Sequence, residues 1–305
     1  MIDLSIIIVN YNTKEFLKKC LVSILSSIDG KPSTSLVRGK INYEIIVVDN
    51  ASSDKSAEMT RKEFSHIKLI ANEVNGGFSK ANNQGIKISQ KSRYVLFLNP
   101  DTVVQKNTIE EMIKFMDQHI DVGASTCKLV MPNGEIDDAS HRGFPTPWNA
   151  FTHFSGLSKL SPRSKLLSGY SLGWMDLESA HEIDALAGAF MIVRREAGDQ
   201  VNWWDEDYFF YGEDIDFCFM LKERGWKIYY VPTVFVTHYK GVSGGIKKVS
   251  KEITTASEET KKRATKWRFN AMRIFYDKHY REKYPRFMTF LVNKGIKFRE
   301  KLAGV

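Results

Sequence analysis

Acidic side chains stand directly after two apolar runs that have the length of β-strands. The run over 93–98 ends in Asn99-Pro100-Asp101, where Pro100 disfavours a helical conformation at Asn99 and closes the strand. In an open α/β sheet, ligands bind beyond the carboxyl ends of the strands, so Asp101 is expected where a ligand or a metal ion binds. The alternative is an ordinary turn, because Asn, Pro and Asp are common turn formers.

Asp49 follows the second run, over 43–48, and its carboxylate suits a hydrogen bond from the ring N–H of a nucleobase. Alternatively, Asp49-Asn50 caps the next helix. Asn75-Gly76-Gly77 permits a close approach of the backbone to a ligand, again with an ordinary turn as the alternative. The sequence contains no GxGxxG and no GxxxxGK(S/T) motif, which removes the main support for a dehydrogenase or a P-loop enzyme.

A third acidic group lies between residues 205 and 216, where six carboxylates surround four consecutive aromatic residues. Glu213, Asp214 and Asp216 fall in the first turn of a predicted helix, where the helix dipole favours negative charge. That preference explains some of the acids, but not the aromatic residues that would partly desolvate them. Such surroundings suit a general base that takes a proton from an acceptor hydroxyl.

The elements that position these residues alternate regularly at the start of the chain. Apolar runs over 4–9, 43–48, 67–70 and 93–98 indicate buried strands, and the segments between them show helical periodicity, apart from a polar loop over 29–42. Repeated β–α units predict a parallel, doubly wound sheet.

The pattern changes after Asp101. We expect a helix from Asn107, a strand over 123–131, a hairpin turn at 132–134, a strand over 183–193, a helix from 213 to Gly225, and short strands over 226–230 and 234–237. Residues 141–180 show no clear periodicity, and long irregular segments tend to be functional, so acceptor contacts are expected there.

Composition limits the classes of protein that fit. The 305 residues are 43% hydrophobic and 26% charged, as in an ordinary globular protein. Three widely separated cysteines without a CxxC spacing suggest reduced, buried thiols in the cytosol. The N-terminus lacks the basic region of a signal peptide, and no apolar run approaches the roughly 18 residues of a membrane span, so we expect neither.

The charge is distributed unevenly along the chain. Residues 240–305 hold 18 Lys and Arg against 6 Asp and Glu, a net of +12, and since the whole chain carries +8, residues 1–239 carry −4. This basic, predicted helical tail is either the solvated face of packed helices or, with its aromatic residues, a surface for an anionic membrane. Nucleic acid is disfavoured, because no recognised binding motif accompanies the charge.

Taken together, the ordered motifs resemble family 2 glycosyltransferases of the GT-A fold, and among them bacterial rhamnosyltransferase-like members that extend lipid-linked polysaccharide precursors. The resemblance spans residues 5–243 and is carried by Ser5 to Asn12, Val47 to Asp54, Asn72, Asn75 to Phe78, Asn82 to Gly85, Leu98 to Thr102, Gly188 to Phe190, Glu213 to Asp216 and His238 to Ser243. It implies an α/β GT-A-like domain over 1–240, with a nucleotide-binding half over 1–102 and an acceptor-binding half over 103–240. The basic helical extension then covers 241–305.

The resemblance also implies roles for individual residues. Asp214 would be the base of an inverting transfer, and Asp101 would bind a divalent metal, Mg or Mn, at the diphosphate. The nucleotide site would comprise Tyr11, Asp49, Asn75, Gly77 and Asn99, with Asp49 on a pyrimidine ring. The acceptor site would comprise Glu213, Phe190, Trp203 and Trp204, the last three as apolar walls.

The predicted metal site departs from the commoner pattern of the family. Many members have two aspartates around a middle residue, whereas Asn99 takes the first position here. One carboxylate holds a hard cation poorly, so His238, which resembles a family histidine used as a ligand, is the candidate second ligand. The alternative is a core or loop histidine without a metal.

The resulting expectation is a hexosyltransferase at the cytoplasmic face of the membrane. It would move a sugar, for which we favour L-rhamnose, from a dTDP- or UDP-sugar to a lipid-linked saccharide. A sugar-phosphate nucleotidyltransferase is disfavoured by the lack of a glycine-rich basic loop after the first strand. A non-catalytic module that binds sugar or lipid through the tail is the remaining alternative.

Overall fold

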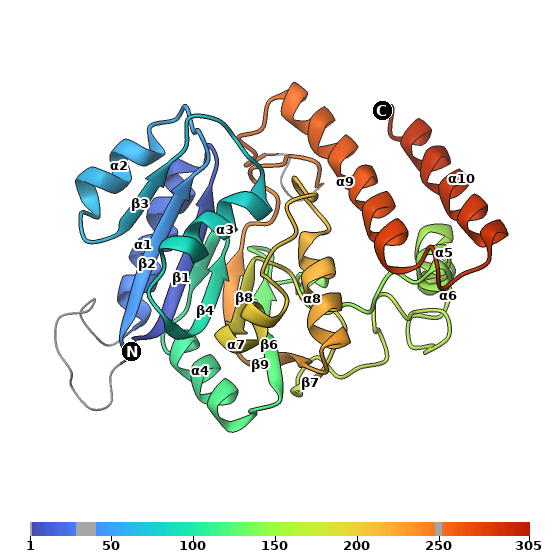
Figure 1. The fold of residues 1–305 in the computed structure, drawn as a ribbon, viewed down its shortest axis with the longest axis horizontal. Helices are drawn as coiled ribbons and strands as arrows, with labels where there is room; N and C mark the ends of the chain where they lie inside the picture. Colours follow the sequence, from blue (N-terminus) through green and yellow to red (C-terminus); the bar gives the residue numbers. More distant parts are fainter. Residues whose placement is uncertain (1, 29–40, 248–251) are drawn as a thin grey trace.

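A computed structural model describes residues 2–28, 41–247 and 252–305 (Figure 1). Within these ranges a sheet of nine strands has the order β3-β2-β1-β4-β8-β6-β9-β5, and β7 pairs with β9. The parallel part comprises β1 (Ile2–Asn10), β2 (Tyr43–Asp49), β3 (Lys68–Ala71) and β4 (Ser92–Leu98). These four strands confirm the apolar runs of the sequence, whereas the polar loop expected over 29–42 lies almost entirely outside the described residues.

Helices cover both faces of this sheet. On one face lie α1 (Lys14–Ser27), α2 (Ser56–Glu63) and α4 (Thr108–Gln118), and on the other lie α3 (Phe78–Ile88), α7 (Arg195–Gln200) and α8 (Glu213–Glu223). Along β1, Ile6 and Ile8 enter the first hydrophobic cluster, while Ile7 and Val9 enter the second. Burial on both faces explains why the strand is apolar throughout, and it confirms the doubly wound architecture.

The second half of the chain adds antiparallel pairs to the sheet. β8 (Phe190–Arg194) lies antiparallel between β4 and β6 (Val122–Val130), and β6 runs parallel to β9 (Lys227–His238). The short β5 (Thr102–Val104) and β7 (His181–Glu182) pair antiparallel with β9. This topology brings the chain just after β4 beside the end of β9.

Two of the predicted strands have wrong boundaries. The strand expected over 183–193 begins only at Phe190, because residues 187–189 border a cavity instead of pairing in the sheet. The two strands expected over 226–230 and 234–237 form one strand, β9. Its pairing with β6 shifts register between Cys127 and Lys128, and this bulge accommodates Pro232, which has no backbone N–H for the ladder.

The segment 141–180 is less irregular than its sequence indicates. It contains α5 (Pro147–Ser155) and α6 (Leu157–Leu160). Helix α5 has a sequence signal that we missed: the Thr146 side chain accepts a hydrogen bond from the Asn149 N–H, and Pro147 occupies the first turn. The predicted hairpin turn at 132–134 is confirmed, since the Gly134 N–H bonds to the Met131 carbonyl.

The basic tail forms two helices, as predicted: α9 (Glu258–His279) and α10 (Arg286–Leu302), drawn in orange and red in Figure 1. Helix α9 packs against α8 through a small aromatic cluster of Tyr208, Phe219, Phe275, Tyr276 and Tyr280. The division of the chain at residue 240 stays a prediction. Among the described residues, none of the helices combines the length and the hydrophobicity needed to cross a bilayer.

Candidate active site

A cavity of about 1100 Å³ opens at the carboxyl ends of the parallel strands and extends toward α5, α9 and α10. Eight of the predicted site residues line it: Tyr11, Asn75, Gly77, Asn99, Asp101, Glu213, Asp214 and His238. The structure therefore brings together residues that lie more than 200 positions apart in the sequence. The structure shows where these eight residues lie, and their roles in binding and catalysis stay predictions.

Asn50 organises the nucleotide side of this cavity, although we had considered it only as a helix cap. Its side-chain amide donates to the Asn75 side chain at 2.9 Å and to the Gly77 carbonyl at 3.0 Å. Its oxygen accepts from the Asn72 side chain and from the Gly76 N–H. Asn50 thereby fixes the Asn-Gly-Gly loop that the sequence analysis singled out.

Gly77 is the position in that loop where only glycine fits. Its φ of +93° lies in the left-handed region, and an added Cβ would come within 2.8 Å of the Phe209 carbonyl oxygen. The Phe78 N–H donates to the same carbonyl at 2.8 Å. Gly77 therefore joins the nucleotide side of the cavity to the aromatic residues that precede α8.

Asp49 lies beneath the cavity rather than on its wall. The side chain is buried, one carboxylate oxygen accepts from the Asn10 amide at 2.8 Å, and the other accepts from the Ser52 N–H at 2.9 Å. The carboxylate thus closes a turn at Ser52 and does not cap the next helix, which begins only at Ser56 with Lys55 as N-cap. Each oxygen has a second lone pair, and the contact of Asp49 with a nucleobase stays a prediction.

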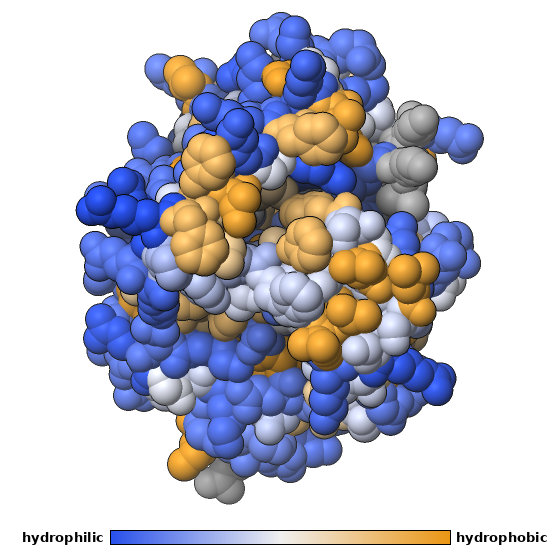
Figure 2. Space-filling model, turned by 90° about the vertical axis from the view of Figure 1, so that its right-hand side faces the viewer, coloured by the Kyte–Doolittle hydropathy of each residue, from blue (hydrophilic) through white to orange (hydrophobic). Residues whose placement is uncertain are grey.

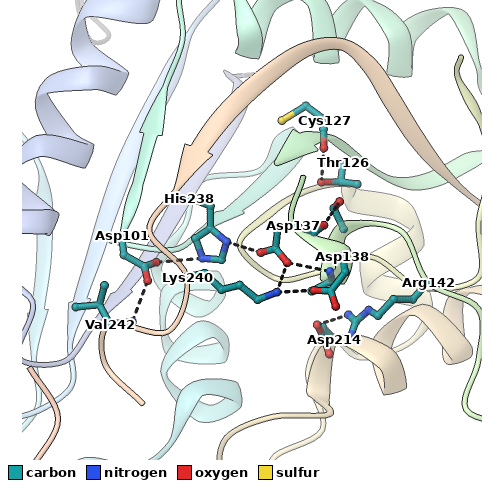
Figure 3. A network of polar contacts seen from close by, with 12 residues as sticks. Asp101, Thr126, Cys127, Asp137, Asp138, Arg142, Asp214, His238, Lys240 and Val242 are labelled. Atoms are coloured by element: carbon teal, nitrogen blue, oxygen red, sulfur yellow. Dashed lines mark hydrogen bonds and ion pairs between the residues drawn. The ribbon is translucent and has the colours of Figure 1, made fainter. Parts of the chain in front are cut away.

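Asp101 and His238 meet because β5 pairs with β9. Thr102 is the partner of His238 in that antiparallel ladder, which sets Asp101 next to the histidine at the end of β9. Asp101 Oδ1 lies 3.4 Å from His238 Nε2, and Oδ2 accepts from the Val242 N–H at 3.4 Å. Figure 3 shows the two side chains directed toward each other. Both are buried and line the cavity.

Asp137 completes this group, and the sequence analysis missed it. The fully buried carboxylate bonds to His238 Nδ1 at 2.7 Å and to Lys240 Nζ, and Lys240 also contacts Asp138 (Figure 3). Burial alone would lower the pKa of His238, but Asp101 and Asp137 outweigh it and raise that pKa to about 9. The two carboxylates thus favour positive charge at the imidazole, as a proton or as a bound cation.

The donor set at Asp101 and His238 fits a divalent cation. His238 Nε2 is buried and has no hydrogen-bond partner, while Nδ1 is fixed by Asp137, an arrangement common for histidine ligands of metals. Among the described residues there is no group of three His, Cys, Asp or Glu side chains that could hold a metal ion. Two protein ligands would therefore need further oxygen atoms, such as those of a diphosphate and water.

Asp214, the predicted base, is paired with Arg142. The Arg142 guanidinium lies 2.7 Å from Asp214 Oδ2 and also donates to the Leu186 carbonyl, while Oδ1 accepts from the Ile215 N–H. Each carboxylate oxygen has a second lone pair free for an acceptor hydroxyl. Asp214 lies in the first turn of α8, and both Asp214 and Arg142 line the cavity.

Unlike Asp214, Glu213 forms no ion pair with a described residue. Its side chain is 8% exposed, and Oε2 is buried without a hydrogen-bond partner. Burial and the charge of Asp214 raise the pKa of Glu213 to about 8. At neutral pH Glu213 is therefore largely a neutral acid that can donate a hydrogen bond into the cavity.

Glu213→Gln should reduce the dependence of stability on pH. Because the folded protein holds the Glu213 proton to about pH 8 and an unfolded chain releases it near pH 4.5, the free energy of unfolding falls as pH rises between these values. Each unit of pKa difference corresponds to about 1.4 kcal/mol. Between pH 5 and pH 9 the free energy of unfolding should therefore fall by a few kcal/mol less in the variant than in the wild type. Urea unfolding at several pH values measures this.

The matched control is Glu223→Gln at the exposed end of the same helix, which should follow the wild type across this pH range. If the wild type and Glu213→Gln lose the same stability between pH 5 and pH 9, Glu213 is not protonated at neutral pH in the folded protein.

Three predicted acceptor contacts do not line the cavity: two lie in the hydrophobic core and the third, Trp203, is partly buried against it. Phe190 is fully buried, and Trp204 packs between Phe97 and Phe217, with ring centroids 4.8 and 4.9 Å away. Trp203 packs beneath the Arg195 guanidinium, outside the cavity. These positions correct the expectation of apolar sugar walls, because aromatic residues next to a motif were taken for ligand contacts when they fill the core behind it.

The chain is similar to known proteins in sequence and in fold. The family described as "Glycosyl transferase family 2" matches residues 5–171, and "Glycosyl transferase family group 2" matches residues 94–299. Rhamnosyltransferase WbbL of Escherichia coli (strain K12) is 28% identical over 242 residues, which cover 77% of this chain and 82% of that protein. The N-acetylglucosaminyl-diphospho-decaprenol L-rhamnosyltransferase of Mycobacterium tuberculosis is 26% identical over 211 residues, or 66% of this chain and 68% of that protein.

Solved structures share the fold at low sequence identity. GalNAc-T7 with UDP, GalNAc and Mn2+ has a TM-score of 0.54 and 15% identity, covering 78% of this chain and 44% of its own. Staphylococcus aureus TarS 1–349 in complex with UDP-GlcNAc has a TM-score of 0.51 and 19% identity, covering 88% of this chain and 66% of its own. The family match over more than half of the chain and the GT-A-like fold lead to one conclusion: the chain belongs to glycosyltransferase family 2 and is a glycosyltransferase.

Proposed function

We propose that the protein is an inverting glycosyltransferase that moves L-rhamnose from a dTDP- or UDP-sugar to a hydroxyl of a lipid-linked saccharide. The observation that carries the proposal is that one cavity holds the nucleotide-side residues, the Asp101–His238 pair and the carboxylate of Asp214. Two of the similar proteins are named as rhamnosyltransferases, and one of those names contains a diphospho-decaprenol acceptor. Both points support the sugar and the class of acceptor.

In this mechanism Asp214 accepts the proton of the acceptor hydroxyl as its oxygen attacks the anomeric carbon. The bond from that carbon to the nucleoside diphosphate breaks on the opposite side, so the anomeric configuration inverts and the diphosphate leaves with the electron pair. Arg142, 2.7 Å from Asp214, pairs with the carboxylate and fixes its direction. Glu213, as a neutral acid, donates a hydrogen bond that orients the acceptor.

The nucleotide side of the cavity positions the donor. Tyr11, Asn75, Gly77 and Asn99 contact the nucleoside diphosphate, with Asp49 as the proposed partner of a pyrimidine base. Asp101 and His238 would hold Mg²⁺ or Mn²⁺, which supplies positive charge that stabilises the leaving diphosphate. A similar structure was solved with UDP and Mn2+, which supports a divalent metal for this fold.

We further propose that the protein works at the cytoplasmic face of the cell membrane, as a peripheral protein held by its C-terminal extension. In the described part of the chain, ten of the fifteen exposed large hydrophobic side chains lie in two segments, 148–166 and 287–302. Basic residues such as Arg286, Lys294 and Lys297 accompany them in α10. Apolar side chains among cations suit an anionic lipid surface, which is where a lipid-linked acceptor would be found.

A panel of nucleotide sugars, each with and without Mg²⁺ or Mn²⁺, tests the proposed donor. One dTDP- or UDP-sugar should raise the melting temperature and be slowly hydrolysed, and only with metal. At 100 times its Kd a ligand stabilises the folded state by about 2.7 kcal/mol, which a thermal shift readily detects. His238→Ala should lose the metal-dependent part of this shift while the nucleotide alone still binds.

Two outcomes would contradict the proposal. Release of pyrophosphate from a nucleoside triphosphate and a sugar phosphate would indicate a nucleotidyltransferase. Binding of the protein to membranes without hydrolysis or transfer from any donor in the panel would indicate a binding module.

A further inference from the structure

The cavity, of about 1100 Å³, is at the upper end of the roughly 300–1,000 Å³ range of ordinary small-molecule pockets. Beyond Asp214 it continues between α5, α9 and α10, whose lining residues are a set of arginines and a set of apolar side chains. This outer part has no role in the mechanism given above.

The arginines of the outer part lack acidic partners. Arg263, Arg268 and Arg299 all line the cavity, and none of them forms an ion pair with a described residue. Nearby Arg142 and Arg273, by contrast, are paired with carboxylates. Unpaired guanidinium groups gathered in a cavity indicate a site for an anion, and planar guanidinium donors match the oxygen atoms of phosphate.

Arg268 is the most constrained of the three. Its Nε is buried without a hydrogen-bond partner. Burial and the neighbouring charge of Arg299 lower its pKa below the usual value, despite the opposite effect of Tyr211. The folded protein therefore holds two like charges close together, partly out of water, which an anion between them would relieve.

Arg268 also adjoins the catalytic end of the cavity. An added Cβ at Gly212, the residue before Glu213, would come within 2.9 Å of Ala271, which lies about one turn of α9 after Arg268, and Arg268 and Glu213 line the same cavity. An anion at Arg268 would thus be close to an acceptor hydroxyl at Glu213 and Asp214. This proximity suits a phosphate that belongs to the acceptor itself.

An apolar surface continues outward from the arginines. Arg299 stacks over the ring of Phe154 in α5 at 4.8 Å, and Phe151, Leu291 and Phe298 line the same cavity while 56%, 55% and 63% exposed. Figure 2 views this face, where apolar side chains gather around a hollow. A hydrocarbon chain attached to a phosphate at the arginines would cover side chains that are otherwise in contact with water.

We propose that Arg268 and Arg299 bind the phosphate groups of an amphiphilic acceptor and that α5 and α10 contact its hydrocarbon chain, so that its saccharide reaches Asp214. This inference rests on the proposed function, because it places the lipid-linked acceptor in the same cavity as the donor. The charge at one end and the apolar wall at the other argue for a lipid phosphate rather than a free phosphate.

Isothermal titration calorimetry with farnesyl diphosphate below its micelle concentration tests the site, with excess UDP and dTDP present to fill the nucleotide side. Inorganic pyrophosphate and farnesol serve as probes of charge alone and chain alone. We expect the full-length protein to bind farnesyl diphosphate at least tenfold more tightly than either. The double variant Arg268→Gln, Arg299→Gln should weaken that binding by about tenfold to a hundredfold, a loss of about 1.4–2.8 kcal/mol, because the charge-assisted hydrogen bonds to phosphate are removed.

A matched control is Lys262→Gln with Lys266→Gln, two exposed cations of the same helix outside the cavity, which should leave the Kd within about twofold. Leu291→Ser with Phe298→Ser, at exposed positions, removes apolar surface without adding charge and should weaken the binding of farnesyl diphosphate without affecting that of pyrophosphate. Unchanged binding in the arginine variant, or pyrophosphate or farnesol binding as tightly as farnesyl diphosphate, would overturn the inference. No donor sugar is used, so a failed donor panel and a failed acceptor site give separate results.

Discussion

Asp214→Asn should lower the rate of sugar transfer by about 10²–10⁴-fold, because the amide keeps the shape of the side chain but cannot take the acceptor proton. The donor should still bind with an unchanged Kd, since the proposed nucleotide contacts are Tyr11, Asn75, Gly77 and Asn99 and do not include Asp214. Single-turnover transfer measures the chemical step, and a thermal shift with the donor nucleotide measures binding. The loss should appear in kcat and in kcat/KM to a similar extent.

Asp207→Asn is the matched control for this change. Asp207 belongs to the same acidic segment, but its side chain is exposed and lies outside the cavity, so transfer should stay within about twofold. Near-normal transfer by Asp214→Asn with intact nucleotide binding would show that another group is the base. Glu213 would then be the first residue to examine, since it shares the cavity wall.

The parallel half of the fold could be predicted because its signals are local. A strand such as β1 is buried on both faces, so its continuous β-branched run is visible without any tertiary information. The residues at the strand ends, such as Asp101 and Asn75, follow from that prediction and from the rule that ligands bind at this edge. These positions were therefore identified before the structure.

The contacts between distant segments could not be predicted in the same way. Asp137 and His238 are 101 positions apart and meet only because β9 and the turn after β6 fold together. Asp137 looks like a surface turn residue in the sequence, since nothing local shows that its carboxylate is fully buried. The pairing of Asp101 with His238 depends on the register of a three-residue strand, β5, which carries too few residues for a pattern.

Strand alternation explains why the acceptor walls were misplaced. Phe190 and Met191 are consecutive in β8, and their side chains enter hydrophobic clusters on opposite faces of the sheet. A motif ending in Phe190 indicates that the backbone passes the cavity, not that the phenyl ring points into it. Ala187 and Ala189, just before the strand, line the cavity instead.

The acidic motif at the start of α8 has two separate functions in the structure. Glu213 and Asp214 line the cavity, whereas Asp216, on another face of the helix, is directed toward α9. The Asp216 carboxylate is 2% exposed and accepts hydrogen bonds from His279 Nε2 at 2.6 Å and from Lys278 Nζ at 2.9 Å. The Tyr208 hydroxyl donates to it at 3.1 Å, so one carboxylate holds α9 against α8.

Asp216→Ala should therefore destabilise the protein by about 1–3 kcal/mol, because His279 Nε2 and the buried Tyr208 hydroxyl lose their shared acceptor, whereas Lys278 keeps its contact with Asp205. Urea unfolding at pH 7 measures the change in the free energy of unfolding. Asp277→Ala, in α9 and paired only at 3.9 Å with an exposed arginine, is the control and should change stability by less than about 0.5 kcal/mol. If both variants unfold at the same urea concentration as the wild type, Asp216 does not hold α9 in place. If Asp216→Ala is destabilised and also binds farnesyl diphosphate less tightly, the position of α9 affects the outer cavity, because Arg263 and Arg268 lie on that helix.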